Sequence, residues 1–394
     1  MEKERLSKDS FFSVGFDLIL LEENLPYDLY INSSTRENRE RFVRIFPMNG
    51  RLSSEDIATF KAKYHQLYVL EKQRQSYLTS LVKNDNFSDI QKTEIIKDSA
   101  ILYLNKVFDP EKEFTTAILE EAIEGCKDSV EHMIDVLEDY EINEVQDLIG
   151  DLSFHDFYTY DHSINVSMYC ISLFKAMKPG AKKEELVLAG LGGLLHDLGK
   201  IKIPTTIINN PGKLSDEDFE TIKQHPDFGG ELLDEGEHCC DGVDFEVIRR
   251  VIMEHHENYN GTGYPNKIEA KDIHVLARVC AICDFFDAIT TKRSYHEVLS
   301  TEDALAVMSK SVGRKIDPKI FEIFCENVNK LGLQGKIKEE LPDDFDPCQP
   351  KNVLPLQAPQ IKKQAEDIFA KEGKEEFGKI KGDSNLFGKD KKAG

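Results

Sequence analysis

The chain lacks several features that would assign it to common protein classes. It has no apolar run of the roughly 18 residues that a membrane-spanning helix needs, so we expect no membrane span. Its opening sequence, MEKERLSKDS, is polar and has no apolar centre of the kind that signal peptides carry. The net charge is -22, whereas proteins that coat nucleic acids are basic. These absences predict a cytoplasmic protein that binds no nucleic-acid polymer.

The cysteines also lack the spacing of a zinc finger. Four of the eight lie in apolar helical runs, where cysteine packs as a small hydrophobe: Cys170, Cys280, Cys283 and Cys325. The adjacent pair Cys239-Cys240 lies in a polar loop and could be a ligand or redox pair, but nothing near it has zinc-finger spacing. We therefore expect free thiols in a reducing cytoplasm.

With 394 residues, of which 40% are hydrophobic, the chain is long enough for two ordinary domains. Residues 1–80 predict a small mixed α/β domain that regulates or binds a partner. Its short apolar runs predict strands at 16–21, 28–31, 41–46 and 66–70, with a helix at 54–64. We expect a helical connector over 81–148, an all-α domain over 149–335 and a flexible polar tail over 336–394.

Apolar residues at three- and four-residue spacing predict the helices beyond residue 73. They fall at 76–82, 90–108, 115–140, 158–177, 183–198, 215–224, 228–233, 244–257, 273–291, 301–311, 318–331 and 361–371. The fold class is therefore α+β overall, with the sheet confined to the N-terminal domain.

A run of Leu, Ala and Gly over 186–195 predicts a buried helix that ends in His196 and Asp197. An ionised carboxylate is costly to bury unless it is paired or binds a metal. The helical region supplies further candidate partners for such a metal: His162, His225, His255, His256, Asp284 and Asp287.

Mixed imidazole and carboxylate ligands suit iron, manganese or zinc better than magnesium. A single catalytic metal takes about three or four protein ligands, so this set is too large for one ion. It fits two metals about 3.5–4 Å apart that share a bridging Asp and hold a hydroxide for attack on a phosphoryl group. Ordinary surface histidines and helix caps remain the alternative interpretation of the residue types alone.

Four sequence motifs carry a resemblance to a known family. They are His196-Asp197-Leu198-Gly199-Lys200, the stretch 210–214, Gln224-His225-Pro226 and the stretch 255–265, HHENYNGTGYP. In this order they resemble the HD-GYP family of bacterial phosphodiesterases that hydrolyse cyclic di-GMP. The resemblance covers residues 154–331 and implies an all-α, metal-dependent helical bundle.

The resemblance implies a role for each residue that matches the family pattern. One metal would be held by His162, His196 and Asp284, the other by His225, His255 and His256, with Asp197 bridging them. Lys200 would point at the scissile phosphate, and Asp287 would be an outer partner of Lys200. Substrate contacts would come from Arg293, Tyr264, Gly261 and Asn260, with Gly261 and Gly263 allowing the loop to turn tightly.

Departures from the family pattern limit what the resemblance implies. Tyr158 stands where some members carry a glutamate that binds a third metal, so we expect two divalent ions, preferably iron, otherwise manganese. Asn260 replaces the usual aspartate of the loop, and the basic positions near Arg293 are altered. The metal set is intact, whereas the substrate contacts have changed.

We therefore expect a metal-dependent phosphodiesterase that hydrolyses cyclic di-GMP to linear pGpG, and GMP after a second cleavage. Two alternatives remain open. One is a weakly active receptor for cyclic di-GMP that docks a signalling protein through the GYP loop or the N-terminal domain. The other is an HD phosphohydrolase that acts on a different nucleotide.

Overall fold

The computed structural model describes residues 10–34, 41–84, 86–108, 115–152, 158–208, 215–235, 242–291 and 299–328. The chain divides into two compact units between Ser88 and Asp89. The first contains a four-stranded sheet and the second is helical, so the expected α+β fold class is confirmed. The expected domain boundaries at 80, 148 and 335 stay predictions.

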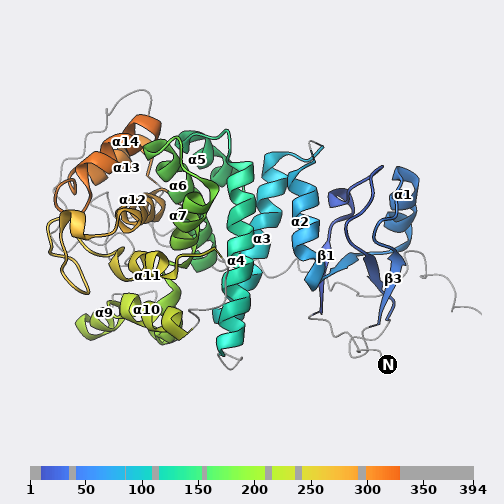
Figure 1. Cartoon of the computed structure of the whole chain (residues 1–394), viewed down its shortest axis with the longest axis horizontal. Coiled ribbons are helices and arrows are strands. Elements are labelled where there is room, and N and C mark those ends of the chain that lie inside the picture. Colours follow the sequence, from blue (N-terminus) through green and yellow to red (C-terminus); the bar gives the residue numbers. More distant parts are fainter. Residues whose placement is uncertain are drawn as a thin grey trace, which may run out of the picture. The chain divides into compact units, whose positions relative to one another are not determined.

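The N-terminal unit is built on an antiparallel sheet in the order β1-β4-β2-β3, of which Figure 1 labels the two outer strands, β1 and β3. Its strands are β1 (Phe11–Val14), β2 (Leu29–Asn32), β3 (Phe42–Phe46) and β4 (Leu67–Leu70). The accompanying helices are η2 (Phe16–Leu18), α1 (Ser54–Lys63), η3 (Glu71–Gln73) and α2 (Arg74–Val82). All four residues of β4 are buried, because this strand pairs with β1 on one side and β2 on the other.

Aromatic side chains form a core cluster of this sheet. Phe11, Tyr68 and Leu70 are buried together, and the ring of Phe42 stacks on that of Phe11 at 4.0 Å between centroids. The strand expected at 16–21 is wrong, because residues 16–18 form the 3-10 turn η2 instead. A short apolar run does not by itself distinguish a strand from a turn, and none of the three residues of η2 is buried.

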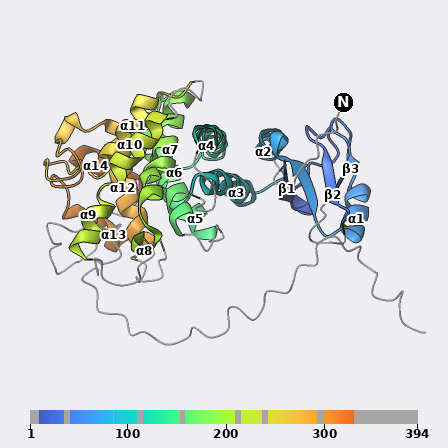
Figure 2. The same ribbon diagram turned by 90° about the horizontal axis from the view of Figure 1, so that it is seen from below.

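The second unit is helical throughout its described residues (Figure 2). Its longer helices are α3 (Asp89–Phe108), α4 (Thr116–Val136), α5 (Ile142–Asp151), α6 (Tyr158–Met177), α7 (Lys183–Leu195), α10 (His225–Glu235), α11 (Phe245–Glu254), α12 (Val275–Thr290), α13 (Thr301–Ser309) and α14 (Pro318–Val328). Shorter elements are η4 (Leu198–Lys202), α8 (Thr205–Ile208), α9 (Asp216–Ile222) and η5 (Ala270–Asp272). None of the described helices is both long and apolar enough to cross a bilayer.

Helix α7 lies at the centre of this unit, in contact with α4, α6, α11 and α12. Every residue from Ala189 to Leu195 is buried. Ser167 of α6 donates a hydrogen bond to the carbonyl oxygen of Gly190 at 2.7 Å, which ties the two helices closely together. The central position of α7 explains why its sequence is apolar on all sides.

Helix α5 is an element that the sequence did not predict. The helix expected over 115–140 corresponds to α4, which ends at Val136, and α5 begins at Ile142 after Glu141 and Glu144 form a reciprocal cap. No Gly or Pro marks the break between them, so the apolar periodicity alone did not show it. The helix expected at 361–371 lies outside the described residues.

The carboxyl group of Asp128 on α4 gives the helical unit a testable dependence on pH. Burial raises the pKa of Asp128 to about 6, and Glu131 and Glu124 act in the same direction. The folded state therefore keeps a proton that the unfolded chain releases near pH 4, so stability falls as the pH rises from about 4 to 6.

We expect Asp128→Asn to raise the melting temperature at pH 8 by about 2–4 °C, the size of a gain of roughly 1 kcal/mol. The gain should disappear below about pH 4, where the aspartate is protonated in both states. Thermal unfolding followed by circular dichroism between pH 4 and 8 measures this. An equal gain at both ends of that range would contradict the assignment.

Candidate metal centre

The centre is organised around the C-terminal end of α7. His196 is the last residue of helical backbone, and Asp197 starts the turn into η4. Their exposed fractions are only 1% and 3%. The Nδ1 atom of His196 lies 2.7 Å from the carbonyl oxygen of Gly193, one turn earlier in α7. This contact fixes the ring with its other nitrogen, Nε2, directed away from the helix.

Four further elements bring the other expected ligands to this point. His162 lies in the first turns of α6, His225 opens α10, His255 and His256 follow α11, and Asp284 lies on α12. Helices α10, α11 and α7 lie side by side (Figure 2).

Gly199 allows η4 to approach α10. A Cβ atom at this position would lie 1.9 Å from the carbonyl oxygen of His225 and 2.4 Å from the backbone nitrogen of Gly229. Any larger residue would push the two segments apart. The glycine of the His196–Lys200 motif therefore positions His225 relative to Asp197.

All seven expected ligands come together, in two clusters. The ligand atoms within each cluster lie within 4.8 Å of one another. The first cluster consists of His162, His196 and Asp284, and the second of Asp197, His225, His255 and His256. Both clusters draw their members from helices far apart in the sequence, so the fold assembles them.

The carboxylate of Asp197 faces both clusters. Its Oδ2 atom lies 3.3 Å from Nε2 of His196, and its Oδ1 atom lies 3.4 Å from Nε2 of His225. Each oxygen is thus directed at a different group of imidazoles. This is the arrangement that a carboxylate shared by two cations requires.

Hydrogen bonds at the Nδ1 atoms of the ligand histidines determine which ring nitrogen can bind a metal. The Nδ1 atoms of His196, His225 and His255 lie 2.7–2.8 Å from the backbone carbonyl oxygens of Gly193, Ile222 and Ile252. Because a carbonyl only accepts, each Nδ1 carries the proton and each Nε2 presents a lone pair to the centre. The Nε2 atoms of His225 and His255 are 3.3 Å apart. Facing lone pairs at this distance repel each other unless a cation lies nearby, so the donor set fits metal ions.

The electrostatics of the second cluster keep its imidazoles neutral. Burial is the main cause that lowers the pKa of His225 to about 3 and that of His255 to about 4, although Asp197 acts in the opposite direction on both. Burial, with His255 and His225, lowers the pKa of His256 well below its usual value. Neutral imidazoles are the form that binds metals.

The carboxylates of the centre stay ionised although they are buried. Burial would raise the pKa of Asp197, but His196, Lys200 and His225 together lower it well below the usual value. Burial would likewise lower the pKa of His162, yet Asp284 and Asp287 outweigh burial and raise it to about 9. The carboxylates around His162 therefore attract positive charge strongly, whether it is a proton or a metal.

Asp287 lies behind His162, one turn beyond Asp284 on α12. It was expected beside Lys200. In the structure its Oδ2 atom lies 2.6 Å from Nδ1 of His162, and its Oδ1 accepts from Asn165 at 2.9 Å. Lys200 instead donates to Oδ2 of Asp197 at 2.5 Å. Asn165 was not among the site residues expected from the sequence, although it lies three residues after His162 and so on the same helix face.

We expect Asp287→Asn to weaken metal binding by the His162 cluster about 10- to 100-fold, because the outer carboxylate orients the imidazole and increases its basicity. The other cluster should keep its affinity. Metal content after dialysis against graded chelator measures both sites, with the exposed Asp216→Asn as the control. Equal losses at both sites would point to general damage of the fold.

The loop that follows His256 approaches the centre closely. The ring of Tyr264 stacks on that of His256 with centroids 4.8 Å apart. Gly261 has φ of +77°, as expected for a tight turn, whereas a Cβ on Gly263 would lie 2.2 Å from the backbone nitrogen of Asn258. Gly263 is therefore needed for space. Asn260 accepts from the backbone and hydroxyl of Thr262, a capping role that an aspartate would also fill.

A cavity of about 200 Å³ lies against the centre. Its lining includes His255, His256 and Asp284, together with Tyr264 from the loop. Glu257, which sequence reasoning did not single out, lines it too and accepts from the backbone nitrogen of Asn266 at 2.6 Å, closing the loop. Arg293, an expected substrate contact, lies outside the described residues.

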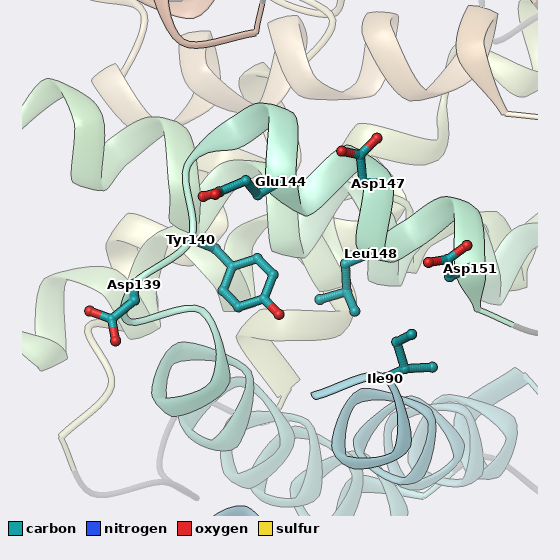
Figure 3. Close-up of a pocket in the computed structure, with 7 residues that line it drawn as sticks. All are labelled: Ile90, Asp139, Tyr140, Glu144, Asp147, Leu148 and Asp151. Carbon is teal, nitrogen blue, oxygen red and sulfur yellow. The ribbon is translucent and has the colours of Figure 1, made fainter. Parts of the chain in front are cut away.

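A larger hollow of about 440 Å³ lies elsewhere in the helical unit, beside α5 (Figure 3). Its lining carries four carboxylates, from Asp139, Glu144, Asp147 and Asp151. These groups would repel an anionic ligand, and no imidazole is among the lining residues. The smaller cavity beside the metal ligands is therefore the candidate site.

Comparison with known proteins supports an HD-type domain. A model of the HD domain family matches residues 149–320. Cyclic di-GMP phosphodiesterase PA4108 of Pseudomonas aeruginosa is 38% identical over 186 residues, which are 47% of this chain and 43% of that protein. The 3'3'-cGAMP-specific phosphodiesterase 2 of Vibrio cholerae is 31% identical over 46% of this chain and 33% of that protein. The chain thus spans less than half the length of these curated relatives.

Among solved structures, Bd1817, a HDG"Y"P protein from Bdellovibrio bacteriovorus, matches with a TM-score of 0.50 and 20% identity. The match covers 80% of this chain and 98% of that one. At this identity the likeness concerns the fold.

Proposed function

We propose that this chain is a metal-dependent phosphodiesterase acting on cyclic di-GMP, because a model of the HD domain family matches residues 149–320 and a cyclic di-GMP phosphodiesterase of Pseudomonas aeruginosa is among its relatives. The product would be linear pGpG, with GMP after a second cleavage. The relatives that carry the names of cyclic di-GMP and cGAMP phosphodiesterases support the reaction class.

One observation carries the proposal. The two oxygens of Asp197 are directed at two separate clusters of imidazoles, 3.3 Å from His196 and 3.4 Å from His225. A histidine that serves only as a hydrogen-bonded core residue needs no second imidazole facing it. We infer two divalent ions, iron or manganese, held by His162, His196 and Asp284 on one side and by His225, His255 and His256 on the other.

The other residues of the site have separate roles in binding the metals and the substrate. Bound divalent ions would supply Lewis acidity and lower the pKa of water to the physiological range. Asp197 holds the two ligand clusters in register, and Lys200 places an ammonium group beside it for the charge of a phosphate. Tyr264, stacked on His256, limits the position of the substrate at the mouth of the cavity.

The test is incubation of the purified full chain with cyclic di-GMP after anaerobic loading with Fe²⁺ or Mn²⁺. We expect linear product by chromatography, and none after chelation. A substrate panel with 3'3'-cGAMP and linear dinucleotides separates this reaction from hydrolysis of another nucleotide. Tight binding measured by calorimetry without any turnover would overturn the enzyme assignment in favour of a receptor.

A further inference from the structure

The cavity beside the metal ligands is also lined by residues that are not among the expected ligands. Besides the metal ligands, its lining includes Lys223 and Lys315, the two lysines of the described lining. Both are partly buried. In a chain with a net charge of -22, two lysines on one small cavity are an unusual local concentration of positive charge.

The two lysines come from different segments, each held in place by its own contacts. Lys223 is the C-cap of α9, two residues before His225, and its ammonium lies 4.7 Å from the centroid of the Phe219 ring. It also pairs with Glu220, whose side chain is 68% exposed. Such an exposed ion pair contributes little, so an anion in the cavity competes with it readily.

Lys315 belongs to the turn of residues 311–316 that follows α13. The backbone nitrogen of Tyr259 donates to the carbonyl oxygen of Lys315 at 3.2 Å, and that of Asn260 donates to Arg314 at 2.9 Å. The turn is therefore tied to the loop that carries Tyr264. Both segments line the same cavity, so the position of Lys315 relative to the metal ligands is fixed by backbone contacts.

The rest of the lining is suited to a nucleotide. Phe219, Tyr264, Phe285 and Ile316 give apolar and aromatic surface next to the lysines. Glu257, the other carboxylate beside Asp284, is directed at the loop backbone and is only 3% exposed. Lys223 and Lys315 are thus the cationic side chains of the described lining besides its imidazoles.

We propose that Lys315 and Lys223 form a subsite for the second phosphate of a cyclic dinucleotide, the one that is not cleaved. The inference rests on the proposed function, because it assumes that the first phosphate lies at the metal ligands. A cyclic dinucleotide carries its two phosphates on opposite sides of one ring, so a cavity that binds one beside the metals presents the other elsewhere on its wall. Two ammonium groups there select substrates with two phosphates over simple diesters.

The subsite contacts the substrate equally before and during cleavage, so its loss should raise KM and leave kcat nearly unchanged. Removing both lysines, Lys223→Ala with Lys315→Ala, should raise KM for cyclic di-GMP about 10- to 100-fold, the usual effect of losing charged hydrogen bonds. The kcat should stay within about threefold. The variant Lys315→Arg should retain most of the affinity for cyclic di-GMP, because arginine keeps the positive charge at this position.

Two substrates make the test specific. Bis(p-nitrophenyl) phosphate has a single phosphate, so its hydrolysis should be unchanged in the double variant. The effect on 3'3'-cGAMP should equal that on cyclic di-GMP, because the subsite contacts phosphate and no base. Lys319→Ala, an exposed lysine four residues after Lys315, is the matched control.

Equal losses on bis(p-nitrophenyl) phosphate and cyclic di-GMP, or unchanged KM for cyclic di-GMP, would overturn the subsite. If the wild-type chain binds cyclic di-GMP without cleaving it, the proposed reaction fails, and calorimetry on the same variants still decides the subsite. Binding that persists in the double variant would exclude it. A wild-type chain that binds no cyclic di-GMP would overturn both proposals.

Discussion

Replacing Asp197 with alanine should abolish hydrolysis of cyclic di-GMP and reduce bound metal from two ions per chain to none. The reason is that each oxygen of this carboxylate faces a different ligand cluster. Without it, each cation loses a ligand and the charge that offsets the repulsion between the two cations. The expected loss of activity is about a thousandfold or more. Metal analysis after anaerobic purification, together with product chromatography, measures both effects.

The control for Asp197→Ala is a measurement of the melting temperature, which shows whether the fold is intact. Asp197 has an exposed fraction of 3% and pairs with Lys200, so its removal leaves an ammonium group that is 21% exposed and can be hydrated. We therefore expect the metal-free variant to melt within a few degrees of the metal-free wild type. One ion retained per chain would show that Asp197 serves a single cluster and would refute the shared carboxylate.

The sequence predicted the helical unit well because its apolar periodicity is strong. The start of α7 at Lys183 and the burial of its whole second half follow from an apolar run interrupted only by glycines. The failures lie where periodicity is short or where a break has no Gly or Pro. The turn at Phe16–Leu18 and the junction between α4 and α5 are the two examples. At the junction a reciprocal cap of Glu141 and Glu144 starts α5, and in η2 the backbone nitrogen of Leu18 bonds to the carbonyl oxygen of Gly15. Neither contact is visible in the spacing of apolar residues.

The ligand set was predictable for a different reason. Imidazoles and carboxylates at helix ends stand out in an apolar helical region, and the order of the motifs made them specific. The neighbours of the ligands were not predictable. Asp287 was expected beside Lys200, but its Oδ2 atom lies 2.6 Å from Nδ1 of His162 instead. Lys223 and Lys315 were not among the expected site residues, and the packing of the turn against the loop brings Lys315 to the cavity.

Replacing Lys200 with alanine is the second change for which we expect a large effect. Lys200 lies on η4, where its backbone nitrogen bonds to the carbonyl oxygen of Asp197 at 2.9 Å and its ammonium donates to the Asp197 carboxylate. Cations on both sides of Asp197 would weaken this ion pair, and the ammonium, already 21% exposed, can then turn towards an incoming phosphate. We expect kcat to fall about 100- to 1000-fold, the usual effect of removing one donor to a developing negative charge.

The metal content separates this role from a structural one. If Lys200 acts on the phosphate, Lys200→Ala keeps both ions, because no metal ligand has changed. Lys200→Arg should then recover part of kcat, since it keeps the charge but places it differently. If Lys200 serves only to hold Asp197, the alanine variant should instead lose metal and activity together, and added metal should restore both. Single-turnover hydrolysis at saturating Mn²⁺ therefore distinguishes the two roles: a slow step that excess metal does not correct places Lys200 at the phosphate.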